Sequence, residues 1–116
     1  MLSFKNRFHG HGSLRYVYKN GQAVRGRLAT LKHTPNPRRK TPRVAVVVSK
    51  KVYKRAVGRN RIRRRVYETV RRELPALDPQ CDLVFIVSSS ELMTIPQNEL
   101  DDTIQQLLAI PGTPLF

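Results

Sequence analysis

The sequence predicts an α+β fold, an α/β sandwich in which helices pack on one sheet, and two kinds of pattern indicate it. Residues 43–48 (RVAVVV) and 82–88 (DLVFIVS) are short apolar runs with the length and β-branched composition of buried strands. Residues 59–74 and 94–110 instead carry apolar residues at helical spacing. Such elements, mixed along a chain of 116 residues, predict a single domain.

The amino-terminal part predicts a basic arm, a helix and a strand. Residues 1–12 are basic and irregular, which is typical of a flexible terminus. Residues 13–21 (SLRYVYKNG) predict a short helix with Ser13 as its N-cap, because their apolar residues fall at positions i, i+3 and i+4. Residues 23–32 (AVRGRLATLK) alternate between apolar and polar residues and predict a strand with a bend at Gly26.

The middle of the chain predicts a loop, a central strand and a long helix. Residues 33–42 (HTPNPRRKTP) hold three prolines and predict a mobile loop. The near-continuous apolar run at 43–48 predicts a central strand covered on both faces. The following helix, which Pro75 should end, has an apolar residue at every fourth position: Ile62, Val66, Val70 and Leu74.

The carboxy-terminal part predicts a buried strand, a helix and a tail. Residues 82–88 form the strand. In the helix of residues 94–110, Thr94 or a neighbour is the expected cap and Pro96 suits the first turn. The inner side of this helix should consist of Leu100, Ile104, Leu107 and Leu108. Residues 110–116 complete the chain as a tail.

Charge is large and segregated along the chain. The formal net charge is +14, all 22 lysines and arginines precede residue 73, and the eight acidic residues begin at Glu68. A charge of this size destabilises a compact state through self-repulsion, which a polyanionic partner relieves. Nucleic acid is the first candidate partner and an anionic membrane surface the second. A membrane-surface protein would need bulky apolar residues exposed beside the basic face, and here the apolar stripe is better used on a sheet.

The long helix concentrates this charge, with seven arginines between residues 59 and 72. At about 100° per residue, five of them are expected on the side away from Ile62: Arg61, Arg64, Arg65, Arg71 and Arg72. Guanidinium groups match phosphate oxygens and stack on bases. A rigid row of them should therefore bind a polyanion with a steep salt dependence, although charge alone does not distinguish RNA from DNA.

Catalytic, metal and membrane motifs are not apparent in the sequence. The basic half holds His9, His11 and His33 but no carboxylate, and adjacent Asp101 and Asp102 point in different directions on a helix. We therefore expect no protein active site. The single Cys81 excludes an intrachain disulfide and is expected to be a buried thiol in a reducing compartment. The longest apolar run, VAVVV, is too short to span a bilayer, so we expect a cytoplasmic protein.

Residues 49–74 (SKKVYKRAVGRNRIRRRVYETVRREL) resemble the signature of the bacterial ribonuclease P protein component. A strand ending in Ser-Lys-Lys, an Ala-Val pair after a short connection, and Arg-Asn-Arg opening a helix carry the resemblance, which extends over nearly the whole chain. It implies a four-stranded sheet and a left-handed βαβ crossover. It also implies a protein subunit of ribonuclease P, an RNA-based endoribonuclease that removes the 5′ leader of precursor tRNA. A general RNA-binding module, such as a ribosomal protein, explains the charge equally well but not these motifs at this spacing.

The resemblance also implies partners and site residues. The partners would be ribonuclease P RNA and precursor tRNA, with Mg²⁺ bound mainly by the RNA and no obligate protein partner. Contacts to the ribonuclease P RNA would come from Lys50, Lys51, Lys54, Arg59, Asn60, Arg61, Arg63 and Arg64. The leader of precursor tRNA would lie in a cleft lined by Leu14, Tyr18 and Lys32. Leu14 and Lys32 stand where relatives have aromatic residues, which favours backbone contact over stacking, and Tyr67 stands where relatives often have a basic residue.

Overall fold

The computed structural model describes residues 12–36, 42–73 and 81–109. Along the chain its elements are helix α1 (Gly12–Asn20), strands β1 (Gln22–Arg25), β2 (Ala29–Pro35) and β3 (Arg43–Val47), helix α2 (Ala56–Glu73), strand β4 (Cys81–Val87), the 3₁₀ helix η3 (Ser90–Met93) and helix α3 (Gln97–Leu108). Helix α1 begins one residue before Ser13, which therefore lies inside the helix rather than at its N-cap.

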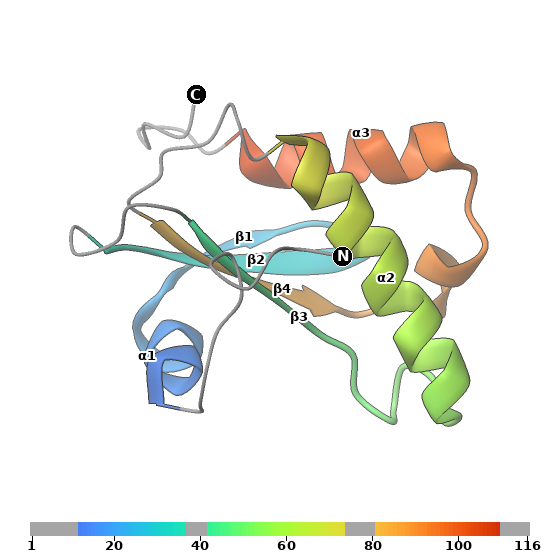
Figure 1. Ribbon diagram of the computed structural model, residues 1–116, viewed down its shortest axis with the longest axis horizontal. Helices are drawn as coiled ribbons and strands as arrows, with labels where there is room; N and C mark the ends of the chain where they lie inside the picture. Colours follow the sequence, from blue (N-terminus) through green and yellow to red (C-terminus); the bar gives the residue numbers. More distant parts are fainter. Residues whose placement is uncertain (1–11, 37–41, 74–80, 110–116) are drawn as a thin grey trace.

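The four strands form one sheet in the order β1-β2-β4-β3. Strand β2 runs antiparallel to β1 and β4, whereas β3 and β4 are parallel neighbours. Parallel neighbours need a crossover connection, and α2 supplies it, so β3, α2 and β4 form a βαβ unit. Helices α2 and α3 lie on one face of the sheet and α1 lies on the other (Figure 1). The α+β architecture and the four-stranded sheet expected from the sequence are confirmed.

The single strand predicted for residues 23–32 is wrong, because this segment is a hairpin. Strand β1 ends at Arg25, and the backbone N–H of Gly26 donates to the Ala29 carbonyl at 2.9 Å to close the turn. Alternation of apolar and polar residues continues through the turn, so the pattern alone did not reveal the reversal. Gly26 was the sign of the turn in the sequence. It follows the end of β1 and does not form a bend within one longer strand.

The loop predicted for residues 33–42 begins later than expected. Strand β2 continues through His33 and Thr34 to Pro35, and all three residues pair with β4. Proline is tolerated here because it is the last residue of the strand. Residues 37–41 lie outside the described residues.

Strand β3 is buried as predicted but lies at the edge of the sheet, not at its centre. Val44 and Val46 belong to the core on the α2 side, whereas Ala45 packs with the α1 side. Both faces are therefore covered although only one edge is paired. A continuous apolar run indicates that both faces of a strand are covered. It does not show whether the strand lies at the centre or at the edge of the sheet.

Helix α2 attaches to the sheet through the predicted apolar stripe. Ile62, Val66 and Val70 are each at most 1% exposed and lie in the main core cluster. Burial of such side chains stabilises a fold by about 1.5–3 kcal/mol each. Leu74 and Pro75, predicted to extend and end this helix, lie outside the described residues.

The predicted final helix begins three residues later than expected, and a short 3₁₀ helix that was not predicted precedes it. Residues Ser90–Met93 form η3, and α3 begins only at Gln97 with Pro96 at its N-cap. Thr94 or a neighbour was expected to cap this helix and Pro96 to lie in its first turn. Thr94 instead ends η3, where its backbone N–H donates to the Glu91 carbonyl, and Pro96 takes the N-cap position of α3. The predicted inner residues of α3 are all buried: Leu100, Ile104, Leu107 and Leu108. In the described part of the chain, none of the helices combines the length and apolarity needed to cross a membrane.

His33 should make stability depend on pH. Its side chain is buried, and this burial lowers its pKa from the usual value of 6.5. As the pH falls through the unfolded value of about 6.5, the unfolded chain binds the proton first, so the free energy of unfolding should decrease. Urea denaturation between pH 7.5 and 5.5 should show a smaller decrease for His33→Gln than for the wild type. Equal pH dependence in the two proteins would show that His33 titrates alike in both states.

Candidate nucleic-acid interface

The connection from β3 to α2 is a tight turn that carries three of the predicted site lysines. The Ser49 carbonyl accepts backbone N–H groups from Val52 at 3.1 Å and Tyr53 at 3.3 Å. This turn places the side chains of Lys50, Lys51 and Lys54 at the surface, where they are exposed. None of the three lysines forms an ion pair with a described residue. Their charge is therefore available to an external anion.

Arg59 holds this turn against the start of α2. Its guanidinium Nη1 donates to the carbonyls of Tyr53 at 3.1 Å and Lys54 at 2.6 Å, and its side chain is half-buried. Arg59 is thus in the predicted surface, but part of its donor capacity fixes the backbone of the turn. Its direct contact with RNA stays a prediction.

Gly58, in the first turn of α2, also allows the turn at residues 49–54 to pack closely against the helix. A Cβ atom at this position would lie 2.2–2.8 Å from ring atoms of Tyr53. Only glycine leaves room for the ring to lie across the first turn of α2. The basic turn and the helix are consequently packed as one unit.

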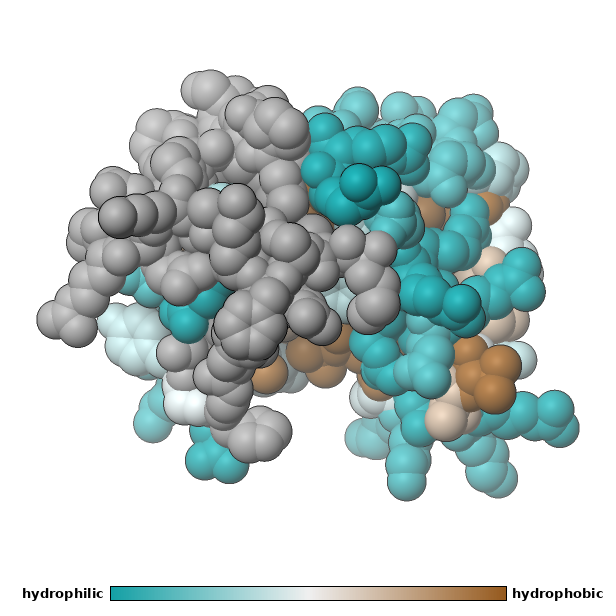
Figure 2. Space-filling model, in the orientation of Figure 1, coloured by the Kyte–Doolittle hydropathy of each residue, from teal (hydrophilic) through white to brown (hydrophobic). Residues whose placement is uncertain are grey.

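The outward stripe of α2 contains the remaining predicted residues. Arg61 and Arg64 are exposed and have no hydrogen-bonding or ionic partner among the residues described. Arg63 is half-buried, and its Nη2 donates to Oδ1 of Asn60. Lys50, Lys51 and Lys54 with these four residues and Arg59 form one surface, which we call the cationic surface. Figure 2 shows hydrophilic side chains covering the side of the molecule that carries α2.

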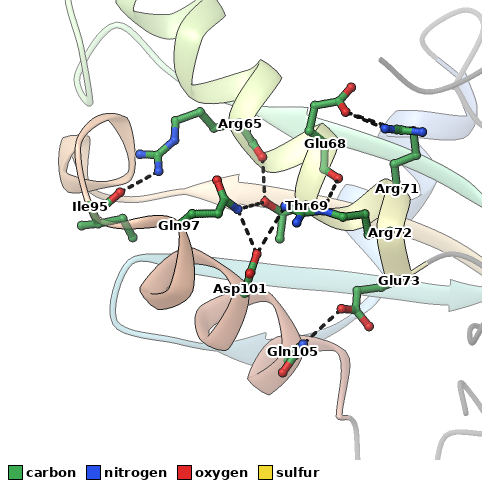
Figure 3. Close-up of polar contacts among 10 residues, drawn as sticks. All are labelled: Arg65, Glu68, Thr69, Arg71, Arg72, Glu73, Ile95, Gln97, Asp101 and Gln105. Atoms are coloured by element: carbon green, nitrogen blue, oxygen red, sulfur yellow. Dashed lines mark hydrogen bonds and ion pairs between the residues drawn. The ribbon is translucent and has the colours of Figure 1, made fainter.

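Arg65 was predicted to face outward, and this prediction is wrong. Its guanidinium turns back to the connection between η3 and α3, where it donates to the carbonyl of Leu92 at 2.9 Å and to that of Ile95 at 2.6 Å. Figure 3 shows the bond to Ile95. Arg65 follows Ile62 by three positions and so lies only about 60° from it on the helical wheel, beside the apolar stripe and not opposite it as predicted. A long side chain at this edge can reach acceptors that the sequence does not reveal. Arg65 therefore has a structural role.

The far end of α2 is partly neutralised by acidic residues. Arg71 and Arg72 are exposed as predicted, yet Arg71 pairs with Glu68 at 2.9 Å and Arg72 with Asp101 at 3.5 Å (Figure 3). Such exposed pairs contribute little to stability. They nevertheless reduce the positive potential here, so the cationic surface is strongest at the start of α2.

On the opposite face of the sheet, α1 leaves part of the strands uncovered. Val17 is buried against Ala45 and Val84, which pins the helix to the sheet. Val47 and Ile86 on the same face are only partly buried. An apolar strip of sheet thus remains accessible beside α1.

The three residues predicted for the leader cleft lie on this face. Leu14 is partly buried with Val17, and the Lys32 ammonium donates to the Tyr18 carbonyl and lies 4.7 Å from the centre of the Tyr18 ring. Tyr18 is 46% exposed, and Tyr16 is 58% exposed. Composition favours a core position for Tyr18 and partial burial for Tyr16, whereas the structure places both at the surface. Lys32 and Tyr18 form one unit with an aromatic ring, a cation and accessible apolar surface.

Sequence reasoning missed a buried ion pair at the end of the sheet. Asp82 is 3% exposed and accepts two bonds from Arg43, at 2.9 and 2.8 Å, and one from Asn36 at 3.0 Å. Asp82 does lie near the start of β4, as expected, but a carboxylate inside a strand also required a cationic partner. Arg43 and Asp82 are direct neighbours in the parallel register, so the pair joins the starts of β3 and β4.

The described histidine, cysteine and acidic side chains are spread over the fold and do not gather into a metal cluster. No group of three or more His, Cys, Asp or Glu side chains in residues 12–36, 42–73 and 81–109 could hold a metal ion. Cys81 is buried, as predicted. His9 and His11 lie outside these residues.

Comparison with known proteins gives consistent matches. A family model described as Ribonuclease P matches residues 2–111. The ribonuclease P protein component of Roseiflexus castenholzii is 38% identical over 96 residues, which cover 83% of this chain and 77% of the relative. That of Chloroflexus aurantiacus is 46% identical over 71 residues, or 61% of this chain, and the match spans about half of the relative's length, 52%.

Solved structures show the same fold. The RNase P protein from Thermotoga maritima superposes with a TM-score of 0.79 at 23% identity, covering 91% of this chain and 98% of that one. The RNase P protein of Staphylococcus aureus gives a TM-score of 0.79 at 21% identity, covering 94% and 97%.

Arg64 and Arg65 form a matched pair for separating surface charge from structure. Arg65→Gln should lower the free energy of unfolding by about 2 kcal/mol, because two charge-assisted hydrogen bonds to carbonyls are lost. Arg64→Gln should change it by less than about 0.5 kcal/mol, since an exposed side chain is replaced by another good helix former. Urea denaturation of both variants is the measurement, and similar values for the two would contradict the structural role of Arg65.

Proposed function

The chain belongs to the ribonuclease P protein family, and from this premise we propose that it is the protein subunit of a bacterial ribonuclease P. In this role it binds the catalytic RNA and the 5′ leader of precursor tRNA and assists removal of the leader to give the mature 5′ end. The family match over residues 2–111 and the formal net charge of +14 both support the proposal.

The observation that carries this proposal is the cationic surface. Its lysines stand on a turn that Arg59 and Gly58 lock to the start of α2, and Arg61 and Arg64 have no acidic partner among the described residues. A preorganised array loses less conformational entropy on binding than a flexible tail does. Neutralising several phosphates also releases counterions, which favours a polyanionic RNA as the partner.

The face that carries α1 supports contact with a single strand. Aromatic side chains next to cations suit unpaired nucleotides, since the rings stack on bases and the cations contact phosphates. Lys32 lies over the Tyr18 ring, and Leu14 supplies no ring. We therefore expect the leader to be held mainly through its backbone, with at most one base stacked on Tyr18.

The two surfaces lie on opposite faces of the sheet, so one protein can contact two RNA molecules at once. Ribonuclease P RNA and precursor tRNA are both polyanions and repel each other. Positive charge between them reduces this repulsion and so reduces the Mg²⁺ concentration needed for assembly. The described residues do not fit a Mg²⁺ site, because they offer no cluster of carboxylates, and we assign the metal and the chemistry to the RNA. The proposed reaction takes place in the cytoplasm.

Reconstitution tests the proposed function directly. At low Mg²⁺, a bacterial ribonuclease P RNA should cleave precursor tRNA only when this protein is added, and the protein alone should not cleave. The products are resolved by gel electrophoresis. A lack of stimulation with the matched RNA would instead favour a general RNA-binding module. Cleavage by repurified protein alone would overturn the assignment of chemistry to the RNA.

Tyr18→Ala should weaken binding of precursor tRNA to the reconstituted complex about fivefold, and binding of mature tRNA should not change. The reason is that only the precursor carries a leader that can stack on this ring. Equilibrium binding of both tRNAs gives the comparison. Tyr16→Ala, an exposed tyrosine on a different side of α1, is the matched control. Equal losses for precursor and mature tRNA would argue against a leader cleft at α1.

A further inference from the structure

A small pocket lies on the outer side of α2, and the proposed leader cleft does not include it. It has a volume of about 270 Å³ and is lined by Asn60, Arg63, Arg64 and Tyr67, with mainly apolar walls. These residues are spaced by three or four positions and therefore form one stripe of the helix. The pocket is smaller than the roughly 300–1,000 Å³ of sites for drug-sized ligands, which suits a single planar group.

Tyr67 gives this pocket a fixed wall. Its hydroxyl oxygen accepts the backbone N–H of Val46 on the edge strand β3 at 3.2 Å. Its ring is partly buried and packs against the main core cluster. Both contacts hold the ring in place before any ligand arrives, so little side-chain entropy remains to be lost on binding.

The other three side chains supply polar groups beside the ring. Asn60 Oδ1 accepts a hydrogen bond from Arg63, which leaves the amide nitrogen of Asn60 without a partner among the described residues. Arg64 is exposed and likewise has none. The pocket thus combines an aromatic face, an amide donor for the edge of a base and a guanidinium for a phosphate.

We propose that this pocket holds one unstacked nucleotide of the bound ribonuclease P RNA, with its base against the Tyr67 ring and its phosphate near Arg64. The inference rests on the RNA-binding function proposed above and adds a specific contact to it. Unpaired bases splayed from RNA are recognised by stacking on aromatic side chains and by hydrogen bonds to their edges. The charge of the surrounding surface matches this occupant.

Salt dependence separates stacking from charge. Binding of a bacterial ribonuclease P RNA is measured over a series of salt concentrations for the wild type, Tyr67→Leu, Tyr67→Phe and Arg61→Gln. Tyr67→Leu should weaken binding about fivefold or more with an unchanged salt slope, because it removes a ring but no charge. Tyr67→Phe keeps the ring and should stay within about twofold of the wild type. Arg61→Gln should weaken binding and reduce the slope by about one phosphate contact.

The outcomes distinguish this inference from the proposed function. Wild-type affinity for Tyr67→Leu, together with a normal loss for Arg61→Gln, would overturn the pocket and leave the function standing. A wild-type protein that does not bind the RNA would overturn the function itself. If Tyr67→Leu does not fold, the exposed Asn60→Ala serves instead, and its loss of affinity at unchanged slope is expected. Wild-type binding by Asn60→Ala would then overturn the inference.

Discussion

The packing of one apolar stripe on the sheet determines how this molecule presents its charge. Ile62, Val66 and Val70 are buried, and because they recur at helical spacing they fix the rotation of α2 about its axis. Rotation in turn decides that Arg64 faces outward and that Arg65 reaches the carbonyls after η3. Burial of three aliphatic side chains, at about 1.5–3 kcal/mol each, can offset repulsion among neighbouring arginines that water and salt already screen.

The sequence was sufficient for the parts of the fold that depend on local periodicity. The two buried strands and the inner sides of α2 and α3 were predicted because each pattern maps directly to a covered face. On α1 the same spacing also selected Tyr18, which is exposed. The hairpin at Gly26, the edge position of β3 and the late start of α3 after η3 were not. Each of these depends on which distant segment pairs with the chain, and such information is absent from a short window of sequence.

Residues of the candidate site divide in the same way. Exposure of Lys50 and Arg61 followed from charge and helical position. The attachment of Arg59 to the turn and of Arg65 to the η3 connection did not, because their acceptors are backbone carbonyls that any residue could supply. A carboxylate at the start of a buried strand indicates that Asp82 needs a cationic partner. That this partner is Arg43 follows only from the register of β3 against β4.

The two edge strands of the sheet, β1 and β3, affect whether the protein can associate with a second copy of itself. An unpaired strand edge is a template for pairing with a second chain, and proteins often blunt such edges. At one edge, β1 has only four residues and ends with the exposed Arg25. At the other, the outward N–H of Val46 is already taken by the Tyr67 hydroxyl. Both edges therefore disfavour addition of a strand from a second chain.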